Sequence, residues 1–278
     1  MHDAAKLISV VVTTYQRPDA LDAVLRGLSA QGDRDFEVIV ADDGSGPPTA
    51  AAIDGWRQRL GAPLSHVWQP DDGFRAAEAR NRALIAAQGA YVVFLDGDCV
   101  PRASFLARHR ALAEPGWFVA GNRILISAEA TRSVLSSGEA VERWPVAALI
   151  SRRLSGRINR LLPMVDLPGQ AWRRARPERW QGARTCNLAA WRKDLLEIDG
   201  FDTSYRGWGL EDTDLVLRLM RAGVKRKDGR FATGVFHLWH AESDRLPLQE
   251  NQRRLDALIA SRRIRAERGL SSLTGADA

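Results

Sequence analysis

Hydrophobic runs alternate with amphipathic segments between residues 7 and 120. The runs are short, apolar and largely β-branched, which predicts buried strands at 7–12, 36–41, 64–68 and 90–95. The intervening segments have helical periodicity or an alanine-rich composition, which predicts helices at 18–31, 48–60 and 75–88. Apolar strands that alternate with helices form a parallel sheet covered on both faces. Ligands of such sheets bind at the carboxyl ends of the strands, so the residues there are the first candidates for function.

This alternation breaks down between about residues 121 and 183. Nine arginines and two acidic residues lie between Arg143 and Arg179, and tryptophans are interleaved with them. Two interpretations stay open for 143–181: a contact with an anionic membrane surface or a phosphorylated partner, and a solvated helical insertion. Regular elements return near the C-terminus, with a helix predicted at 211–222, a strand at 235–239 and an arginine-rich helix from 246 to about 268.

Composition narrows the class of protein. The 278 residues carry a net charge of +6, and all but four of the 40 basic residues are arginines. Arginine suits phosphate partners because its planar fork binds their oxygens in pairs, although a GC-rich genome explains the same bias. The apolar run at 7–12 is too short for a signal peptide or a membrane span, and two cysteines are too few for a disulfide framework. We therefore expect a cytoplasmic protein, with the basic segment leaving association with the inner face of the membrane open.

Polar clusters follow three of the predicted strands, at 13–17, 42–45 and 96–98. One Asp-Gly sequence is ordinary turn chemistry, but three polar clusters at successive strand ends are harder to attribute to turns alone. In the third cluster, Asp96 and Asp98 flank Gly97, which allows close approach of the backbone. Paired hard oxygens suit Mg²⁺ or Mn²⁺, and such a cation can bridge a diphosphate.

Two more clusters near the C-terminus could carry chemistry. Glu211 and Asp212 open a predicted helix, where the helix dipole keeps carboxylates ionised and able to act as a general base, although helix capping is the alternative explanation. His237 and His240 lie at the end of a predicted strand. If that strand runs to Trp239, both imidazoles cannot bind one metal without a bend, so one of the two is the expected ligand.

Together these segments resemble glycosyltransferase family 2, which has the GT-A fold. The resemblance rests on Val-Val-Val-Thr-Thr-Tyr-Gln-Arg-Pro at 10–18, Ala-Asp-Asp-Gly-Ser at 41–45, Ala-Arg-Asn-Arg-Ala at 79–83, Leu-Asp-Gly-Asp at 95–98 and Trp-Gly-Leu-Glu-Asp at 208–212. The last element, followed by His-Leu-Trp-His, is similar to the chondroitin-polymerase and β-1,4-galactosyltransferase branch. The fold that this implies is α/β, with a Rossmann-like, mostly parallel central sheet flanked by helices.

The resemblance also implies a role for each matching position. The nucleotide is expected to contact Thr13, Tyr15, Arg17, Asp43, Arg75, Arg80 and Asn81, with Asp43 accepting a hydrogen bond from a uracil ring. Mn²⁺ or Mg²⁺ is expected to bind Asp98 and Asp96, with His237 as the preferred third ligand and His240 as the second choice. The donor site is completed by Gly97, Asn187 and Trp208, although 185–187 reads Thr-Cys-Asn where the family usually has Gly-Gly-Asn.

The implied reaction is the inverting, metal-dependent transfer of a sugar from a UDP-sugar to a saccharide or lipid-linked acceptor, in the assembly of surface polysaccharide or lipopolysaccharide. Asp212 would be the catalytic base and Glu211 would bind the acceptor sugar. A GDP-sugar-dependent or retaining relative is the alternative. A nucleic-acid-binding protein is a more remote alternative, because no zinc, helix-turn-helix or RNA-recognition signature is present.

We expect one domain over 1–245, made of a nucleotide-binding half (1–125), an insertion (126–182) and an acceptor half (183–245), and then a C-terminal helix and tail (246–278).

Overall fold

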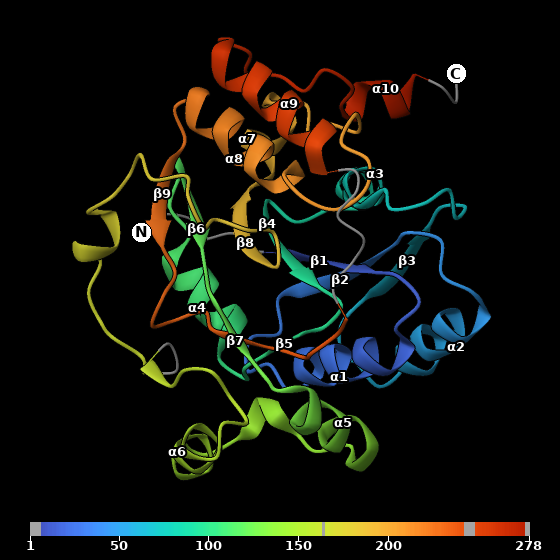
Figure 1. Ribbon diagram of the computed structural model, residues 1–278, viewed down its shortest axis with the longest axis vertical. Coiled ribbons are helices and arrows are strands. Elements are labelled where there is room, and N and C mark those ends of the chain that lie inside the picture. Colours follow the sequence, from blue (N-terminus) through green and yellow to red (C-terminus); the bar gives the residue numbers. More distant parts are fainter. Residues whose placement is uncertain (1–6, 163–164, 242–247, 276–278) are drawn as a thin grey trace.

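The computed structural model describes residues 7–162, 165–241 and 248–275 (Figure 1). Its centre is a seven-stranded sheet in the order β3-β2-β1-β4-β8-β6-β9. The four strands predicted from the sequence pair in parallel: β1 (Ile8–Thr14), β2 (Phe36–Asp42), β3 (Leu64–Trp68) and β4 (Tyr91–Asp96). The sheet continues through β8 (Asn187–Trp191), which is antiparallel to both of its neighbours, to β6 (Trp117–Ala120) and β9 (Lys225–Asp228). The predicted α/β fold with a mostly parallel sheet is thus confirmed.

Helices cover both faces of this sheet, as the apolar strands predict. In Figure 1, α1 (Pro18–Ser29) and α2 (Pro47–Trp56) lie below the sheet, and α3 (Ala76–Ala86), α7 (Arg192–Glu197) and α8 (Glu211–Arg221) lie above it. Successive side chains of a strand point to opposite faces. Accordingly, Val10 and Val12 of β1 belong to the core under α1, whereas Val11 belongs to the core under α3 and α8.

A second, three-stranded sheet brings distant parts of the chain to the end of β4. It consists of β10 (Val235–His237) between β5 (Cys99–Pro101) and β7 (Arg123–Leu125). His237 is paired with Cys99 on one side and Leu125 on the other, and the Leu238 amide donates to the Asp98 carbonyl at 2.9 Å. The strand therefore ends at His237 and not at Trp239, which corrects the prediction of a straight strand over 235–239.

The segment in which the alternation breaks down contains short helices connected by turns. After α4 (Phe105–Leu112), the chain forms α5 (Ala128–Ser137), the 3-10 helix η1 (Val141–Arg143), α6 (Val146–Leu154) and the 3-10 helix η3 (Trp172–Arg174). Figure 1 shows α5 and α6 projecting below the main sheet. Among the described helices, none combines the length and the apolar composition that a bilayer span requires.

The predicted C-terminal helix is shorter in the structure than in the sequence analysis. Its predicted start at 246 lies outside the described residues, and α9 covers Leu248–Ala260. The chain then turns, and a short α10 (Leu270–Thr274) packs on the α3 side. Arg221 of α8 binds this end of α9, because its guanidinium donates to the carbonyls of Leu258 and Ile259 in the last turn of the helix.

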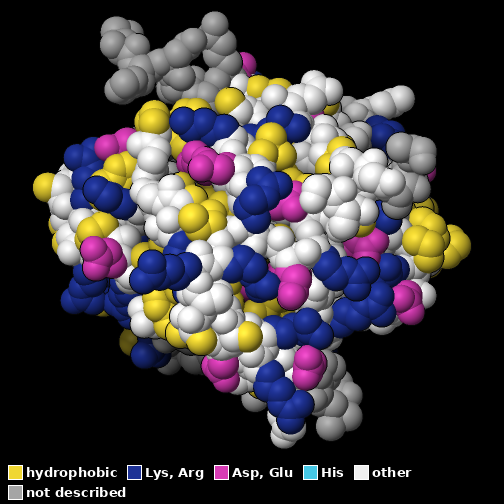
Figure 2. Space-filling view, turned by 90° about the horizontal axis from the view of Figure 1, so that it is seen from above, with side chains coloured by type: hydrophobic (Ala, Val, Ile, Leu, Met, Phe, Trp, Pro, Cys, Tyr) yellow, Lys and Arg dark blue, Asp and Glu magenta, His cyan; other side chains and the backbone are white. Residues whose placement is uncertain are grey.

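Basic side chains are dispersed on the face seen from above in Figure 2. Lys and Arg side chains alternate there with acidic and hydrophobic ones. A nucleic-acid interface requires basic residues gathered along one stripe that follows the phosphates. This face of the molecule therefore gives no support to the nucleic-acid alternative.

Candidate active site

Arg80 connects the ends of three elements. It projects from α3 and is buried, and its guanidinium donates to Thr13 Oγ1 at 3.0 Å, to Glu211 Oε1 at 2.9 Å and to Asp96 Oδ1 at 3.2 Å. Burial by itself would lower the pKa of Arg80, but the carboxylates of Glu211 and Asp96 raise it above its ordinary value. Arg80 is thus a fixed positive charge at the carboxyl edge of the sheet.

Gly97 allows β4 and β1 to approach closely at this edge. Its amide donates to the Thr13 carbonyl at 2.7 Å, and a Cβ atom at this position would lie 2.9 Å from that oxygen. The close approach predicted from the Asp-Gly-Asp sequence is therefore present. Asp96 and Asp98 then leave the strand in different directions, so that Asp96 pairs with Arg80 while Asp98 lies beside the histidines.

Asp98, His237 and His240 form a group that could hold a metal ion. One ligand atom from each, a carboxylate oxygen or an imidazole nitrogen, lies within 4.8 Å of the others. The Nε2 atoms of His237 and His240 are 3.6 and 3.3 Å from Asp98 Oδ2. Because β10 ends at His237, the chain bends and both imidazoles face the same carboxylate. The sequence predicted His237 as the preferred third metal ligand and His240 as the second choice, whereas the structure brings both to Asp98.

The loop before α8 turns Glu211 and Asp212 toward this group. Leu210 precedes the helix with a φ of 78°, next to Gly209 with a φ of 99°, a strained arrangement typical of functional sites. Burial, with the negative charge of Glu211, raises the pKa of Asp212 to about 7, although Arg80 and Arg184 oppose the shift. Within the described residues, the buried Oε2 atom of Glu211 has no hydrogen-bond partner.

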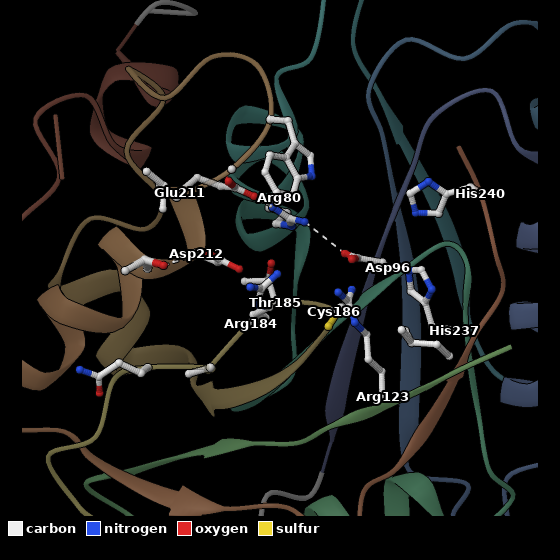
Figure 3. A pocket seen from close by; sticks show the side chains of 18 of the residues that line it. Arg80, Asp96, Arg123, Arg184, Thr185, Cys186, Glu211, Asp212, His237 and His240 are labelled. Carbon is white, nitrogen blue, oxygen red and sulfur yellow. Dashed lines mark hydrogen bonds and ion pairs between the residues drawn. The ribbon is translucent and has the colours of Figure 1, made fainter. Parts of the chain in front are cut away.

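Arg80, Asp96, Glu211, Asp212, His237 and His240 line one cavity of about 520 Å³, and Asp98 adjoins it through its contacts with the two histidines. Figure 3 shows Glu211 and Asp212 on one side of it, His237 and His240 on the other, and Arg80 and Asp96 between them. Trp208 also lines the cavity, as predicted. Sequence analysis did not place four further lining residues in the site, namely Arg123, Trp180, Arg184 and Trp239. Two of them, Arg123 and Trp180, come from the segment without regular periodicity, where their only signal was the abundance of Arg and Trp.

The residues expected to bind the nucleotide lie beside this cavity, at the ends of β1 and β2. Tyr15 is exposed and donates to Asp71, and Arg17 is paired with Asp19. Asp43 is buried, and its two oxygens accept from Gln69 Nε2 at 2.6 Å and from the Arg75 amide at 2.7 Å. The Arg75 side chain bends back to Glu78 and to the Pro70 carbonyl. Their contacts with a nucleotide stay predictions.

Asn81 and Asn187 are the two predicted site residues that the structure places in the core. The Asn81 amide donates to the Phe201 carbonyl and accepts from the Phe201 amide, both at 2.8 Å. Asn187 donates to the carbonyls of Asn122 and Thr233, and its oxygen lies 3.1 Å from His109 Nε2. Both buried amides are thus satisfied within the protein, and their expected contact with the donor stays a prediction.

Fold and site together define a class of enzyme. A mostly parallel sheet presents buried arginine charge, a group of side chains that could hold a metal ion and a carboxylate of raised pKa at its carboxyl edge. The model of the glycosyl transferase family 2 matches residues 9–194, and that of the N-terminal domain of galactosyltransferase matches 173–241. The chain therefore belongs to glycosyl transferase family 2, and the resemblance seen in its sequence is confirmed.

Named relatives support this assignment. Validoxylamine A glucosyltransferase of Streptomyces hygroscopicus subsp. limoneus is 30% identical over 238 residues, which cover 82% of this chain and 51% of that protein. Chondroitin synthase of Escherichia coli is 29% identical over 231 residues, covering 78% of this chain and 32% of that protein. The chain thus spans about half the length, or less, of these curated relatives.

Solved structures share the fold. S. aureus TarS 1–349 in complex with UDP superposes with a TM-score of 0.60 and 16% identity, covering 91% of this chain and 65% of that chain. The mannosyltransferase PcManGT from Pyrobaculum calidifontis, in complex with GDP-Man and Mn²⁺, has a TM-score of 0.55 and 20% identity, covering 85% and 58%. At these identities the likeness establishes the GT-A architecture alone.

Proposed function

We propose that this chain is an inverting, metal-dependent glycosyltransferase that moves a sugar from a UDP-sugar to a saccharide or lipid-linked acceptor in surface polysaccharide assembly. One observation carries the proposal: Asp212, with a raised pKa, lines the same cavity as Arg80 and the two histidines that contact Asp98. The similarity to a chondroitin synthase and to a UDP complex of TarS supports the donor and the polymeric product.

The three ligand atoms of the Asp98, His237 and His240 group suit Mn²⁺ better than Mg²⁺. Asp98, His237 and His240 offer one oxygen and two nitrogens. Mg²⁺ prefers oxygen ligands, whereas Mn²⁺ tolerates imidazole, so this set favours Mn²⁺. Burial lowers the pKa of His237, which keeps the imidazole in the neutral form that binds metals. A cation bound there would offset the negative charge of a departing diphosphate. Asp96, paired with Arg80, is better placed for the donor side than for the cation.

Side chains of the cavity stabilise the leaving group, accept the proton and bind the acceptor. Arg80, Arg123 and Arg184 present positive charge to the diphosphate as its negative charge grows. Asp212 accepts the proton of the acceptor hydroxyl while that hydroxyl attacks the anomeric carbon from the face opposite the leaving group, which inverts the configuration. The unpartnered Oε2 atom of Glu211 is free to accept a hydrogen bond from a second acceptor hydroxyl.

Ligand-dependent thermal stability tests the donor and the cation. We expect UDP with Mn²⁺ to raise the melting temperature, because a ligand at about 100 times its Kd adds about 2.7 kcal/mol to the folded state. GDP-mannose with Mn²⁺, and UDP with a chelator, should stabilise less. The variant His240→Ala should lose the Mn²⁺-dependent part of the shift and keep the fold. Equal stabilisation by UDP with and without metal would contradict the metal site, and a larger effect of the guanine nucleotide would contradict the donor.

We also propose that α6 contacts an anionic membrane. Three of its apolar side chains recur at every fourth position and face solvent: Val146 is 68% exposed, Ile150 43% and Leu154 83%. Residues four apart lie on one side of a helix, so the three form a continuous apolar stripe. Arg152 and Arg153 lie in the last turn of the helix, where Arg152 is paired with Glu139 and Arg153 supplies the positive charge beside the stripe. An apolar stripe beside arginines is typical of helices that lie in the interface of an anionic bilayer.

A further inference from the structure

A second, smaller pocket lies at the edge of the main sheet, outside the site described above. It measures about 220 Å³ and forms where η3 packs against β9, the edge strand labelled in Figure 1. Five of its lining residues are arginines and one is an aspartate: Arg173, Arg176, Arg179, Arg226, Arg230 and Asp228. We refer to it as the arginine pocket. Asp228 is already paired with Arg230 at 2.6 Å, so most of the positive charge has no carboxylate beside it.

Two of these arginines are held rigidly by backbone groups. Arg173 is buried and donates to the carbonyls of five residues of the surrounding loops. Arg226 donates to the carbonyls of Arg179 and Gln181 at 2.9 and 2.8 Å. Burial lowers the pKa of Arg226; the carboxylate of Asp228 opposes this shift, and the positive charges of Arg179 and Arg230 add to it. Neighbouring like charges are thus held together at a cost that a bound anion would offset.

The other two arginines are available to a ligand. Arg176 and Arg179 are exposed, and within the described residues neither side chain forms an ion pair or a hydrogen bond. Guanidinium groups bind carboxylates and phosphates through two parallel hydrogen bonds. Trp172 adds an aromatic wall, held by a hydrogen bond from its Nε1 atom to the Pro168 carbonyl and by edge-to-face contact with Phe231. An apolar ring beside guanidinium groups suits a sugar that bears a negative charge.

The arginine pocket is adjacent to the catalytic cavity along the chain. Arg179 lines the former and the next residue, Trp180, lines the latter. Consecutive Cα atoms are only about 3.8 Å apart, so a glycan of a few sugars can extend from one pocket to the other. We propose that the arginine pocket is a subsite for an anionic sugar of the acceptor glycan, a uronate or a sugar phosphate, at a distance from the sugar that is extended. This inference rests on the proposed transferase function.

Binding of charged and neutral glycans tests the subsite without donor or metal. The probes are a fluorescently labelled, glucuronate-containing hyaluronan octasaccharide and a neutral chitohexaose, titrated at low ionic strength. We expect the charged probe to bind at least tenfold more tightly and inorganic phosphate to compete with it. The variant Arg176→Gln/Arg179→Gln should weaken its binding at least tenfold. The matched control Arg253→Gln/Arg262→Gln, which removes the same charge from exposed positions in and after α9, should change it less than twofold.

Three results would overturn the subsite. The two double variants could lose affinity equally, which would indicate non-specific attraction, or the neutral glycan could bind as well as the charged one. The arginine variant could instead lose only its binding to phosphatidylglycerol vesicles and keep its glycan affinity, which would assign the pocket to a lipid headgroup. A failure of UDP to stabilise the protein, with this glycan binding intact, would remove the proposed transfer reaction and leave the anion pocket in place.

Discussion

Arg80 shows how one buried cation organises the candidate site. Its three hydrogen bonds join the end of β1, the end of β4 and the start of α8, elements that are distant in sequence. Without it, the carboxylates of Asp96 and Glu211 would lie in a buried site with no cation between them. Removal of one partner from a buried charge network is costly, because the remaining charges stay desolvated.

We therefore expect Arg80→Met to lower the free energy of unfolding by about 3–5 kcal/mol, as measured by urea denaturation at pH 7.5. Arg82→Met is the matched control on the same helix. Arg82 pairs with Glu78 near the surface, so its loss should cost about 1 kcal/mol or less. Adding Glu211→Gln to the Arg80 variant should recover part of the loss. Equal stabilities of the two single variants would contradict the role given to Arg80.

Asp212 is expected to carry the chemical step. Asp212→Asn should lower kcat/KM by about 10²-fold or more, because general-base assistance contributes about 10² to 10⁴. For the unchanged enzyme, kcat/KM should rise with pH and level off above about 7, since only the ionised carboxylate accepts a proton. The variant should keep its stabilisation by UDP with Mn²⁺, which separates catalysis from binding. A variant that retains much of the rate would favour a retaining mechanism.

The helix α6 has an apolar stripe that is exposed to solvent instead of being packed in the core. Only Leu149 of this helix is buried, and its stripe of Val146, Ile150 and Leu154 faces outward. Exposed apolar stripes are unfavourable in water unless another surface covers them. The anionic membrane proposed above would provide that surface, with the arginines contributing electrostatic attraction.

Replacing the stripe with Val146→Ser/Ile150→Ser/Leu154→Ser should reduce sedimentation with phosphatidylglycerol-containing vesicles at least tenfold. Full burial of such side chains contributes about 1.5–3 kcal/mol each. Ile85→Ser/Leu196→Ser/Ile264→Ser is the control, because these apolar side chains are also exposed but lie on other elements. Equal sedimentation of both triple variants, or unchanged sedimentation of the first, would rule out α6 as the contact.

The raised pKa of Asp212 should make the stability of the whole molecule depend on pH. Asp212 binds its proton more tightly in the folded chain than in the unfolded chain, where its pKa is near 3.8. Its stabilising effect is thus complete below about pH 4 and is lost as the pH rises through about 7. At pH 8, without ligands, Asp212→Asn should melt about 2–4 °C higher than the unchanged protein. This corresponds to about 1 kcal/mol, a value reduced because the side chain is partly accessible to solvent.

The pH dependence provides the control for this prediction. At pH 4 the carboxyl group is protonated in the folded chain and partly protonated in the unfolded chain, so the difference between the two melting temperatures should shrink. An equal difference at pH 4 and pH 8 would show that ionisation of Asp212 is not its source. Bound UDP with Mn²⁺ should also change the difference at pH 8, because it alters the charge around the carboxylate.

Much of this architecture follows from local patterns that any reader of the sequence can detect. The four parallel strands are continuous apolar runs, and continuous burial on both faces requires that composition. The Asp-Gly-Asp turn and the Glu-Asp helix start could also be recognised, because each depends on residues adjacent in the chain. By contrast, β9 reads Lys-Arg-Lys-Asp and carries no apolar signal. It is a strand because its backbone pairs with β6, and its Lys227 side chain reaches the Leu112 carbonyl and Glu114, far away in sequence.

The tertiary structure alone decided which side chains meet. Asn81 and Asn187 lie within segments that resemble the family, yet packing turns both into the core. His237 and His240 converge on Asp98 only because β10 inserts between β5 and β7 and ends at His237, two residues before its predicted end. Periodicity reports the burial of a segment, which is a local property. The composition of a site depends on distances between segments, and those distances exist only once the sheet has formed.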